Sequence, residues 1–388
     1  MKIADVRVTP MRLPLKKPYV WSQGLEDAFT VNLIEIESDD GTIGIGETTT
    51  APDALAQKRI IDRLSRHFIG EPLFDYPRLV ARAYKGDFLA FGANMPRLAN
   101  QIFSGLEMAV LDLQGKLLER PVWDLLGGAV RADVGYFYFL QGDTPQELAE
   151  DARSAVADDH PIIYLKVGVG EHHDIEATRL VREAIGDARL RLDANEAWDP
   201  ALALRMMARL APYDIEYIEQ PTSSRSQHAL RHLKERSPIA LGADQSVFTV
   251  GDVYSACRDG VADMIAVGPR EIGGLRAMSV AAGITDAAGL RLCIHSSMTT
   301  GITTCAEHHV ARTIANLDDG NQIMWQLLEE DIVSTPALSP GAGRLALPAA
   351  PGLGVTLDRD RVAKANRRFE DWLATSVPPS AISSTATA

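Results

Sequence analysis

Five residues that could take part in chemistry recur at a regular spacing through the second half of the chain. Each lies at the end of, or just after, a short apolar run that predicts a buried strand. They are Lys166, Asp193, Glu219, Asp244 and His295. The first four are 27, 26 and 25 residues apart, and the 51 residues from Asp244 to His295 equal two such steps. One step is long enough for a strand, a crossover helix and two short loops, so the spacing predicts one chemical group per βα unit.

The three acids in this set predict a site for a divalent cation. Asp193, Glu219 and Asp244 lie at three consecutive predicted strand ends, flanked by apolar residues that do not favour unpaired charge. If the strands close into a barrel, their carboxyl ends meet at one face, and converging carboxylates repel one another unless a cation binds them. One carboxylate per strand, completed by water and substrate oxygens, suits the octahedral preference of Mg2+. For any one of these acids taken alone, a helix cap or a loop contact is the alternative.

Lys166 and His295 stand at the two ends of the set and could transfer protons. A lysine in an apolar barrel mouth beside a cation can have a depressed pKa and act as a general base. The alternative for Lys166 is a salt bridge to one of the carboxylates. His295 could be a second acid or base across the substrate, or a satisfied core histidine. Asn195, two residues after Asp193, could hydrogen-bond a ligand or form a turn.

A Mg2+ site next to a lysine base favours one reaction class, the abstraction of the proton α to a carboxylate. That proton is too weakly acidic for a lysine unless the developing negative charge is held by a cation. The second acid then decides whether the substrate is reprotonated, loses a β-leaving group or closes a ring.

The elements that must position these groups follow from the periodicity of apolar residues. Residues 1–50 alternate apolar and polar side chains around a D-D-G hairpin signal, which predicts a β-meander. Residues 52–126 have helical periodicity, and from residue 133 onward short apolar runs alternate with helical patterns. The alternating part contains eight predicted strands, the last over residues 322–328, and seven clear helices.

This alternation predicts an α/β fold, a (β/α)8-type or modified TIM barrel with an N-terminal α+β capping domain. An open doubly wound sheet has the same alternation, but it usually places its ligand at one switch point and not at five successive strand ends. We expect the capping domain over residues 1–130, the barrel with the metal and catalytic site over 131–340, and a segment packed back on the capping domain over 341–376. Residues 377–388 are small and polar and are expected to be disordered.

Composition narrows the possible partners. The formal net charge of −13 disfavours nucleic acid, because phosphate binding needs a basic surface. No apolar run approaches the length of a membrane span, and the N-terminus lacks the apolar region of a secretory signal, so we expect no membrane partner and a cytoplasmic location. The 3 scattered cysteines fit reduced thiols better than a disulfide framework or a zinc site.

Several motifs around these residues jointly resemble the enolase superfamily, and within it the mandelate racemase and muconate lactonizing enzyme branch. The motifs are MAVLDLQGKLLERPVWDLLGG, YLKVG, RLDANEAW, YIEQP, LGADQS, IGGL and HSSMTTG, and the likeness covers nearly the full length. The resemblance implies a capping domain over a modified barrel, with Asp193, Glu219 and Asp244 as the three Mg2+ ligands. It also implies a small carboxylate substrate and a homo-oligomer, either a dimer or an octamer.

Two departures from the pattern of this branch narrow the implied activity. Members often carry a K-x-K pair on the second strand, whereas here Tyr164 takes the first position and Lys166 the second. Gly268 stands where one subgroup has a second lysine, and where another has an Asp that pairs with a His at the position of His295. A lysine-pair racemase of acylamino acids or dipeptides is thereby disfavoured.

The resemblance therefore favours a dehydratase or cycloisomerase of a small hydroxy or sugar acid, with Lys166 as the base and an unpaired His295 as the acid. The alternatives are a racemase or epimerase that uses the same two groups, and a non-catalytic member whose acids bind metal only structurally. Specificity is expected from a loop over residues 14–30 and from the segment around 48–56. The predicted substrate-binding residues are Tyr19, Trp21, Thr49, Tyr164, Asn195 and Trp325.

Overall fold

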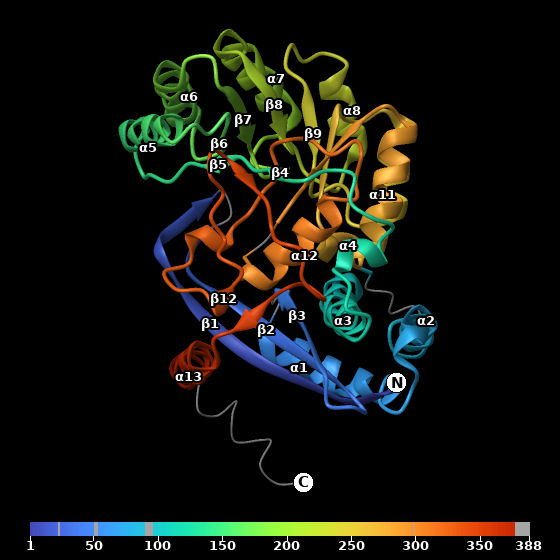
Figure 1. Cartoon of the computed structure of the whole chain (residues 1–388). Helices are drawn as coiled ribbons and strands as arrows, with labels where there is room; N and C mark the ends of the chain where they lie inside the picture. The colour runs from blue at the N-terminus through green and yellow to red at the C-terminus, as the bar shows by residue number, and fades with distance from the viewer. Residues whose placement is uncertain (22–23, 50–52, 90–95, 297, 377–388) are drawn as a thin grey trace.

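The computed structural model describes the chain except for residues 22–23, 50–52, 90–95, 297 and 377–388 (Figure 1). The predicted disorder of 377–388 lies outside this described part, and so does the side chain of Trp21. A capping domain and a barrel are stacked on one another, the cap below the barrel in the view of Figure 1.

The N-terminal meander is confirmed as a three-stranded antiparallel sheet in the order β1-β2-β3. Its strands are β1 (Ile3–Trp21), β2 (Gly24–Ser38) and β3 (Ile43–Thr49). The predicted loop at 14–30 is wrong, because both of its sides belong to a long hairpin in which Tyr19 pairs with Glu26. The prolines that suggested a loop are tolerated because β1 is an edge strand whose register shifts between Pro14 and Tyr19.

Helices cover one side of this sheet, and the predicted helical segment is confirmed. They are α1 (Ala54–Leu64), α2 (Tyr76–Asp87), α3 (Pro96–Leu117) and α4 (Val122–Leu125), with 3-10 turns at Ser65–His67 and Leu73–Asp75. The long helix α3 packs closely on β3. A Cβ atom at Gly44 would lie 2.1 Å from the carbonyl oxygen of Ala109, so only glycine allows this approach of the two backbones.

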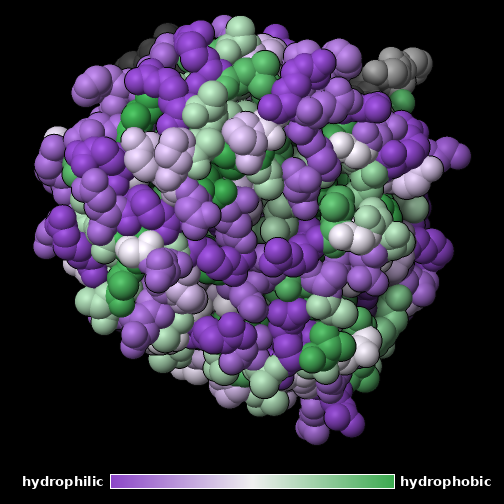
Figure 2. All heavy atoms as spheres, turned by 90° about the horizontal axis from the view of Figure 1, so that it is seen from above, coloured by the Kyte–Doolittle hydropathy of each residue, from purple (hydrophilic) through white to green (hydrophobic). Residues whose placement is uncertain are grey.

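The second half of the chain forms a curled parallel sheet in the order β11-β10-β9-β8-β7-β6-β5, which confirms the modified barrel. Its strands are β5 (Tyr138–Phe139), β6 (Ile162–Lys166), β7 (Arg189–Asp193), β8 (Ile215–Glu219), β9 (Leu241–Ala243), β10 (Met264–Val267) and β11 (Arg291–Ile294). The helices after them are α5 (Pro145–Ala157), α6 (Glu171–Ile185), α7 (Pro200–Leu210), α8 (Gln227–Lys234), α9 (Val250–Asp259), α10 (Pro269–Ile272), α11 (Leu275–Ala287) and α12 (Gly301–Ala311), with a 3-10 turn at Ala211–Tyr213. The end of the barrel remote from the cap is mostly hydrophilic, with apolar residues in small scattered groups (Figure 2).

The predicted eighth strand over 322–328 is wrong, and an irregular segment closes the barrel instead. Residues 325–327 form a 3-10 helix, while single parallel bridges join Leu317 to Leu292 and Asn321 to Tyr136. The side chain of Asn321 supplies bonds that a strand backbone would make: Oδ1 accepts from the amide of Ile294 at 2.8 Å, and Nδ2 donates to the carbonyl of Gly135 at 2.8 Å. Apolar content alone could not distinguish this segment from a strand.

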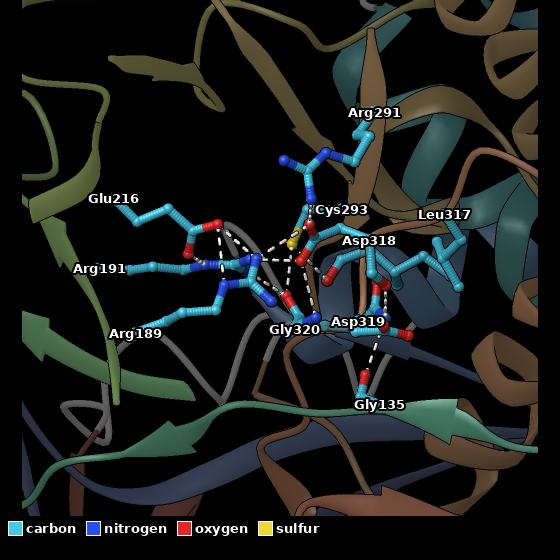
Figure 3. A network of polar contacts seen from close by, with 12 residues as sticks. Gly135, Arg189, Arg191, Glu216, Arg291, Cys293, Leu317, Asp318, Asp319 and Gly320 are labelled. Atoms are coloured by element: carbon cyan, nitrogen blue, oxygen red, sulfur yellow. Dashed lines mark hydrogen bonds and ion pairs between the residues drawn. The ribbon is translucent and has the colours of Figure 1, made fainter. Parts of the chain in front are cut away.

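A buried arginine, Arg191, binds Asp318 and Gly320 of the closing segment and so joins that segment to the barrel (Figure 3). Arg191, inside β7, is 0% exposed; its Nε donates to Glu216 at 2.7 Å and its Nη1 donates to the carbonyl of Gly320 at 2.6 Å. It also pairs with Asp318, which accepts from Arg291 at 2.9 Å. These contacts, here named the Arg191 clasp, hold the closing segment without a regular strand.

The C-terminal part runs back from the barrel to the cap. Its short strands are β12 (Val333–Thr335), β13 (Arg344–Leu345) and β14 (Thr356–Leu357); β12 pairs with β14, and β13 pairs with β4 (Val134–Gly135). The final helix, α13 (Arg359–Ser376), packs beside β1 (Figure 1), and Asn366 donates to the carbonyl of Pro10 at 2.9 Å. Within the described ranges, no helix combines the length and apolarity that crossing a membrane requires.

Candidate active site

The structure brings the five regularly spaced residues to one edge of the sheet. Lys166, Asp193 and Glu219 are the last residues of β6, β7 and β8, and they pair in register across these strands. Asp244 directly follows β9, and His295 directly follows β11. Because parallel strands present their carboxyl ends at the same face of a barrel, all five groups point toward the cap.

The three acids are buried close together and repel one another. Glu219 is 2% exposed, and its Oε1 has no hydrogen-bond partner among the described residues. Burial and the charges of Asp193 and Asp244 raise the pKa of Glu219 well above its usual value. One ligand atom each from Glu219, Asp244 and His295 lie within 4.8 Å of one another. A buried, unpartnered carboxylate oxygen among other acids is what a hard divalent cation would satisfy.

Asp193 completes the acidic set but is held by its neighbours on β6. Its Oδ2 accepts from the hydroxyl of Tyr164 at 2.7 Å and also from the ammonium of Lys166. Its Oδ1 accepts from the amide of Asn195 at 2.9 Å. Asp193 therefore reaches the acidic centre from a fully hydrogen-bonded position, and Tyr164 lies behind it and outside the described lining of the cavity.

Lys166 forms an ion pair, and the prediction that its pKa is depressed is wrong. Its Nζ donates to Oδ1 of Asn195 at 2.6 Å and pairs with Asp193. Burial lowers the pKa of Lys166, but Asp193, Tyr19 and Glu219 raise it by more, so the net shift is upward. The prediction from residue type weighed the apolar surroundings and underweighed the adjacent carboxylate. The salt bridge that stood as the alternative for Lys166 is present.

His295 has carboxylate neighbours, so the prediction that it is unpaired is wrong. Its Nδ1 lies 3.0 Å from Oδ1 of Asp244 and 3.8 Å from Oε1 of Glu271. Burial lowers the pKa of His295, but the carboxylates of Asp244, Glu271 and Glu219 raise it by more, to about 9. Sequence reasoning missed Glu271 because it looked for the partner of His295 only at Gly268. The available signal was a Glu three residues after Gly268, the spacing of a helix N-terminal capping box.

A cavity of about 560 Å3 joins the barrel face to the cap. Lys166, Asn195, Asp244 and His295 line it from the barrel. Of the residues predicted to bind substrate, Tyr19 and Thr49 also line it, and both are buried. Trp325 is not among the described lining residues, although Gln322 and Met324 of the same segment are.

The wall that the cap supplies was only partly predicted. Arg12 and Arg97 of the cap line the cavity with Trp372 of α13, and Arg270 of the barrel helix α10 joins them; none was singled out from the sequence. The guanidinium of Arg12 lies 4.9 Å above the ring centre of Trp372 in α13, and its Nη2 donates to Asp27 at 2.6 Å. The two residues are 360 positions apart, so only the packing of α13 on β1 brings them together.

Both halves of the chain match one family. Residues 3–127 match the mandelate racemase / muconate lactonizing enzyme, N-terminal domain, and residues 147–361 match the enolase C-terminal domain-like family. The chain belongs to the mandelate racemase and muconate lactonizing enzyme branch of the enolase superfamily. The resemblance noted from its motifs is thus confirmed, and enzymes of this branch are generally Mg2+-dependent.

Relatives within this branch carry out different reactions. Muconate cycloisomerase 1 of Pseudomonas putida is 32% identical over 367 residues, covering 91% of this chain and 95% of that protein. The probable glucarate dehydratase of Streptomyces coelicolor is 29% identical over 404 residues, covering 96% and 92%. Sequence similarity therefore supports enolase-superfamily chemistry without separating cycloisomerase from dehydratase.

Solved structures of the branch have the same fold. Muconate lactonizing enzyme from Pseudomonas fluorescens, complexed with muconolactone, has a TM-score of 0.87 at 30% identity, covering 94% of this chain and 99% of that one. Dipeptide epimerase from Enterococcus faecalis, complexed with Mg and L-Leu-L-Tyr, has a TM-score of 0.83 at 27% identity, covering 92% and 100%.

Proposed function

We propose that this protein is a Mg2+-dependent enzyme acting at the carbon α to the carboxylate of a small hydroxy or sugar acid. It removes the α-proton when water is eliminated, or adds a proton to the same carbon when a lactone ring closes. One observation carries the proposal: Lys166 and His295 line the same cavity as Asp244. A base candidate, an acid candidate and a metal-ligand candidate thus reach one substrate-sized space.

The order of the strands supports different tasks for the two residues. Lys166 ends β6 and His295 follows β11, with β7 to β10 between them in the sheet. In a closed barrel, residues so far apart in strand order reach a central ligand from opposite sides. A substrate between them would present its α-hydrogen to one residue and its leaving oxygen to the other.

The acids of the site fit the cation that this reaction needs. Asp193, Glu219 and Asp244 would hold Mg2+, since Glu219 has a buried oxygen without a partner and the three carboxylates otherwise repel one another. The ion, when bound, supplies stabilisation of the negative charge that develops on the substrate carboxylate after proton removal.

Two side chains then carry out the proton transfers, Lys166 as the base and His295 as the acid. With the charge of Asp193 directed to the cation that it would hold, Lys166 in its amine form takes the α-proton at Nζ, while Oδ1 of Asn195 at 2.6 Å keeps Nζ in place. His295 gives a ring proton to the leaving hydroxyl oxygen. The C–H and C–O bonds break, a C=C bond forms, and water departs. Lys166 also borders a second cavity of about 780 Å3, a route by which its proton can reach solvent.

A racemase or epimerase is the second candidate. The observation that favours it is the same opposed pair, Lys166 and His295, because one residue could remove the proton and the other could return it to the opposite face. The similar Enterococcus faecalis structure is that of a dipeptide epimerase. The product decides between the candidates, since inversion changes only the configuration at the α-carbon, whereas dehydration and ring closure change which atoms are bonded.

The test is proton NMR in D2O with Mg2+ and a library of hydroxy acids, sugar acids and dicarboxylates. We expect the wild type to exchange the α-proton of at least one acid and to form a keto acid or a lactone. K166M should lose the exchange, H295Q should lose product formation, and K85M, on an exposed cap helix, should match the wild type. Full α-exchange by K166M would contradict the mechanism. The absence of exchange with every acid, despite bound Mg2+, would favour a non-catalytic member.

A further inference from the structure

We propose that Glu271 is the positioning residue of His295, supplying the carboxylate that position 268 has no room to carry. The inference rests on the proposed function for its kinetic consequence, but its structural basis is independent of the substrate. Three observations carry it: the closed space at Gly268, the fixed carboxylate of Glu271, and the separate place of Asp244 in the acidic centre.

The backbone leaves no room for a side chain at Gly268. A Cβ atom there would lie 2.1 Å from the carbonyl oxygen of His295 and 2.7 Å from Oε2 of Glu271. The space beside His295 that a residue at 268 would enter is therefore filled by the chain itself. An acid that faces the imidazole from this side has to come from another position.

Glu271 occupies that position and is fixed from both ends. Its side chain is buried, and Oε2 accepts from the amide of Gly268 at 2.9 Å. Its own carbonyl accepts from Nδ2 of Asn100 in α3 at 2.7 Å, and the same Nδ2 donates to the carbonyl of Phe248. With Oε2 committed to the backbone, Oε1 lies between the guanidinium of Arg270, with which it pairs, and the imidazole of His295, whose Nδ1 is 3.8 Å away.

Asp244 lies closer to His295, at 3.0 Å, but it has a second task. It belongs to the set of acids proposed to hold the cation, and it lines the substrate cavity. Glu271 is not part of that set and also pairs with Arg270, another cavity residue. Its negative charge can therefore stay with the two cationic side chains beside it, and it orients the ring of His295 toward the cavity.

The kinetic test uses E271Q with Mg2+ and an acid that the wild type turns over. Glutamine keeps the length and the oxygen that accepts from Gly268 but removes the charge. We expect α-proton exchange by Lys166 to stay within about twofold of the wild type. The step assigned to His295 should fall by about 10- to 100-fold, the usual effect of removing a residue that orients a functional group. An equal loss in both steps would overturn the proposal and leave Glu271 a structural cap of α10.

A second readout decides the matter even if no substrate is found. The ring signals of His295, assigned with H295Q in 15N-histidine-labelled protein with Mg2+, should shift in E271Q. Those of the buried His308 and His309, whose rings contact Tyr136 and the amide of Trp123, should not. The matched control is E107Q, because Glu107 is also a buried acid near α10 but bonds Arg276. E107Q should leave the His295 signals in place. Unchanged His295 signals in E271Q would refute the proposal, whatever the activity.

Discussion

Substitution of Gly268 by alanine should disturb the site directly, by an amount that the structure sets. The new Cβ would lie 2.1 Å from the carbonyl oxygen of His295, whereas ordinary contacts begin at 3.4 Å. One of the two backbones must therefore move by about 1.3 Å, the difference between these distances. Overpacking of this kind typically costs about 1–3 kcal/mol, and we expect the upper part of that range because both partners are backbone.

The same displacement acts on catalysis, because the oxygen that must move belongs to His295. A misplacement of about 1 Å can lower a rate by about 100-fold. We expect G268A to keep α-proton exchange by Lys166, which is four strands away from Gly268 in sheet order, and to lose the step assigned to His295 by that factor. Urea unfolding measures the cost in stability, and NMR in D2O measures the two steps separately.

Gly283 offers a matched control. It is an exposed residue within α11, and no atom lies within 4 Å of its added Cβ. G283A should therefore be neutral or should stabilise the protein by up to about 1 kcal/mol, as alanine does in a helix. If G268A is as stable and as active as G283A, then the crowding at Gly268 does not constrain His295, and the reasoning from this contact is refuted.

Three further predictions concern the metal, pH and the barrel. Mg2+ should raise the thermal midpoint of the wild type and not that of E219Q. At 100 times its Kd, the ion should add up to about 2.7 kcal/mol to the free energy of unfolding of the wild type. Burial raises the pKa of Glu47 to about 7, although Thr300 donates to its carboxylate. The folded state therefore binds the proton of Glu47 more tightly than the unfolded state does. The unfolding free energy of the wild type, minus that of E47Q, should fall by about 3 kcal/mol as the pH rises from 4.5 to 7. R191M should lower the unfolding free energy by about 3–5 kcal/mol in urea titrations, because Asp318 loses a buried partner.

The parts of the site that could be predicted are those set by local pattern. Each strand of the barrel is a short apolar run that ends in a polar residue, so Lys166, Asp193 and Glu219 could be placed at one edge from their spacing alone. The meander and the helices of the cap have equally local signals. These local patterns do not show how the charges of Lys166 and the neighbouring carboxylates offset one another in the folded site. The upward pKa shift of Lys166 was missed for that reason.

The missed parts depend on contacts between distant segments. Asn321 closes the barrel with side-chain bonds to Ile294 and Gly135, and no periodicity in its own segment indicates this. The segment over 341–376 was expected to pack on the capping domain, but its composition does not specify that α13 lies on β1 and brings Trp372 to Arg12. Long-range packing therefore decides the shape of the cavity, while local pattern decides its chemistry.

Gly268 and Glu271 are two aspects of one arrangement. From the sequence, a glycine where an acid is expected looks like the loss of a catalytic partner. In the structure the backbone of His295 occupies the space that the acid would need, and a carboxylate reaches the imidazole from one turn further along the chain. An acid restored at 268 would have to displace the histidine that it is meant to orient. The identity of a single position is thus a poor guide to this site, and the position of the carboxylate in space is the better one.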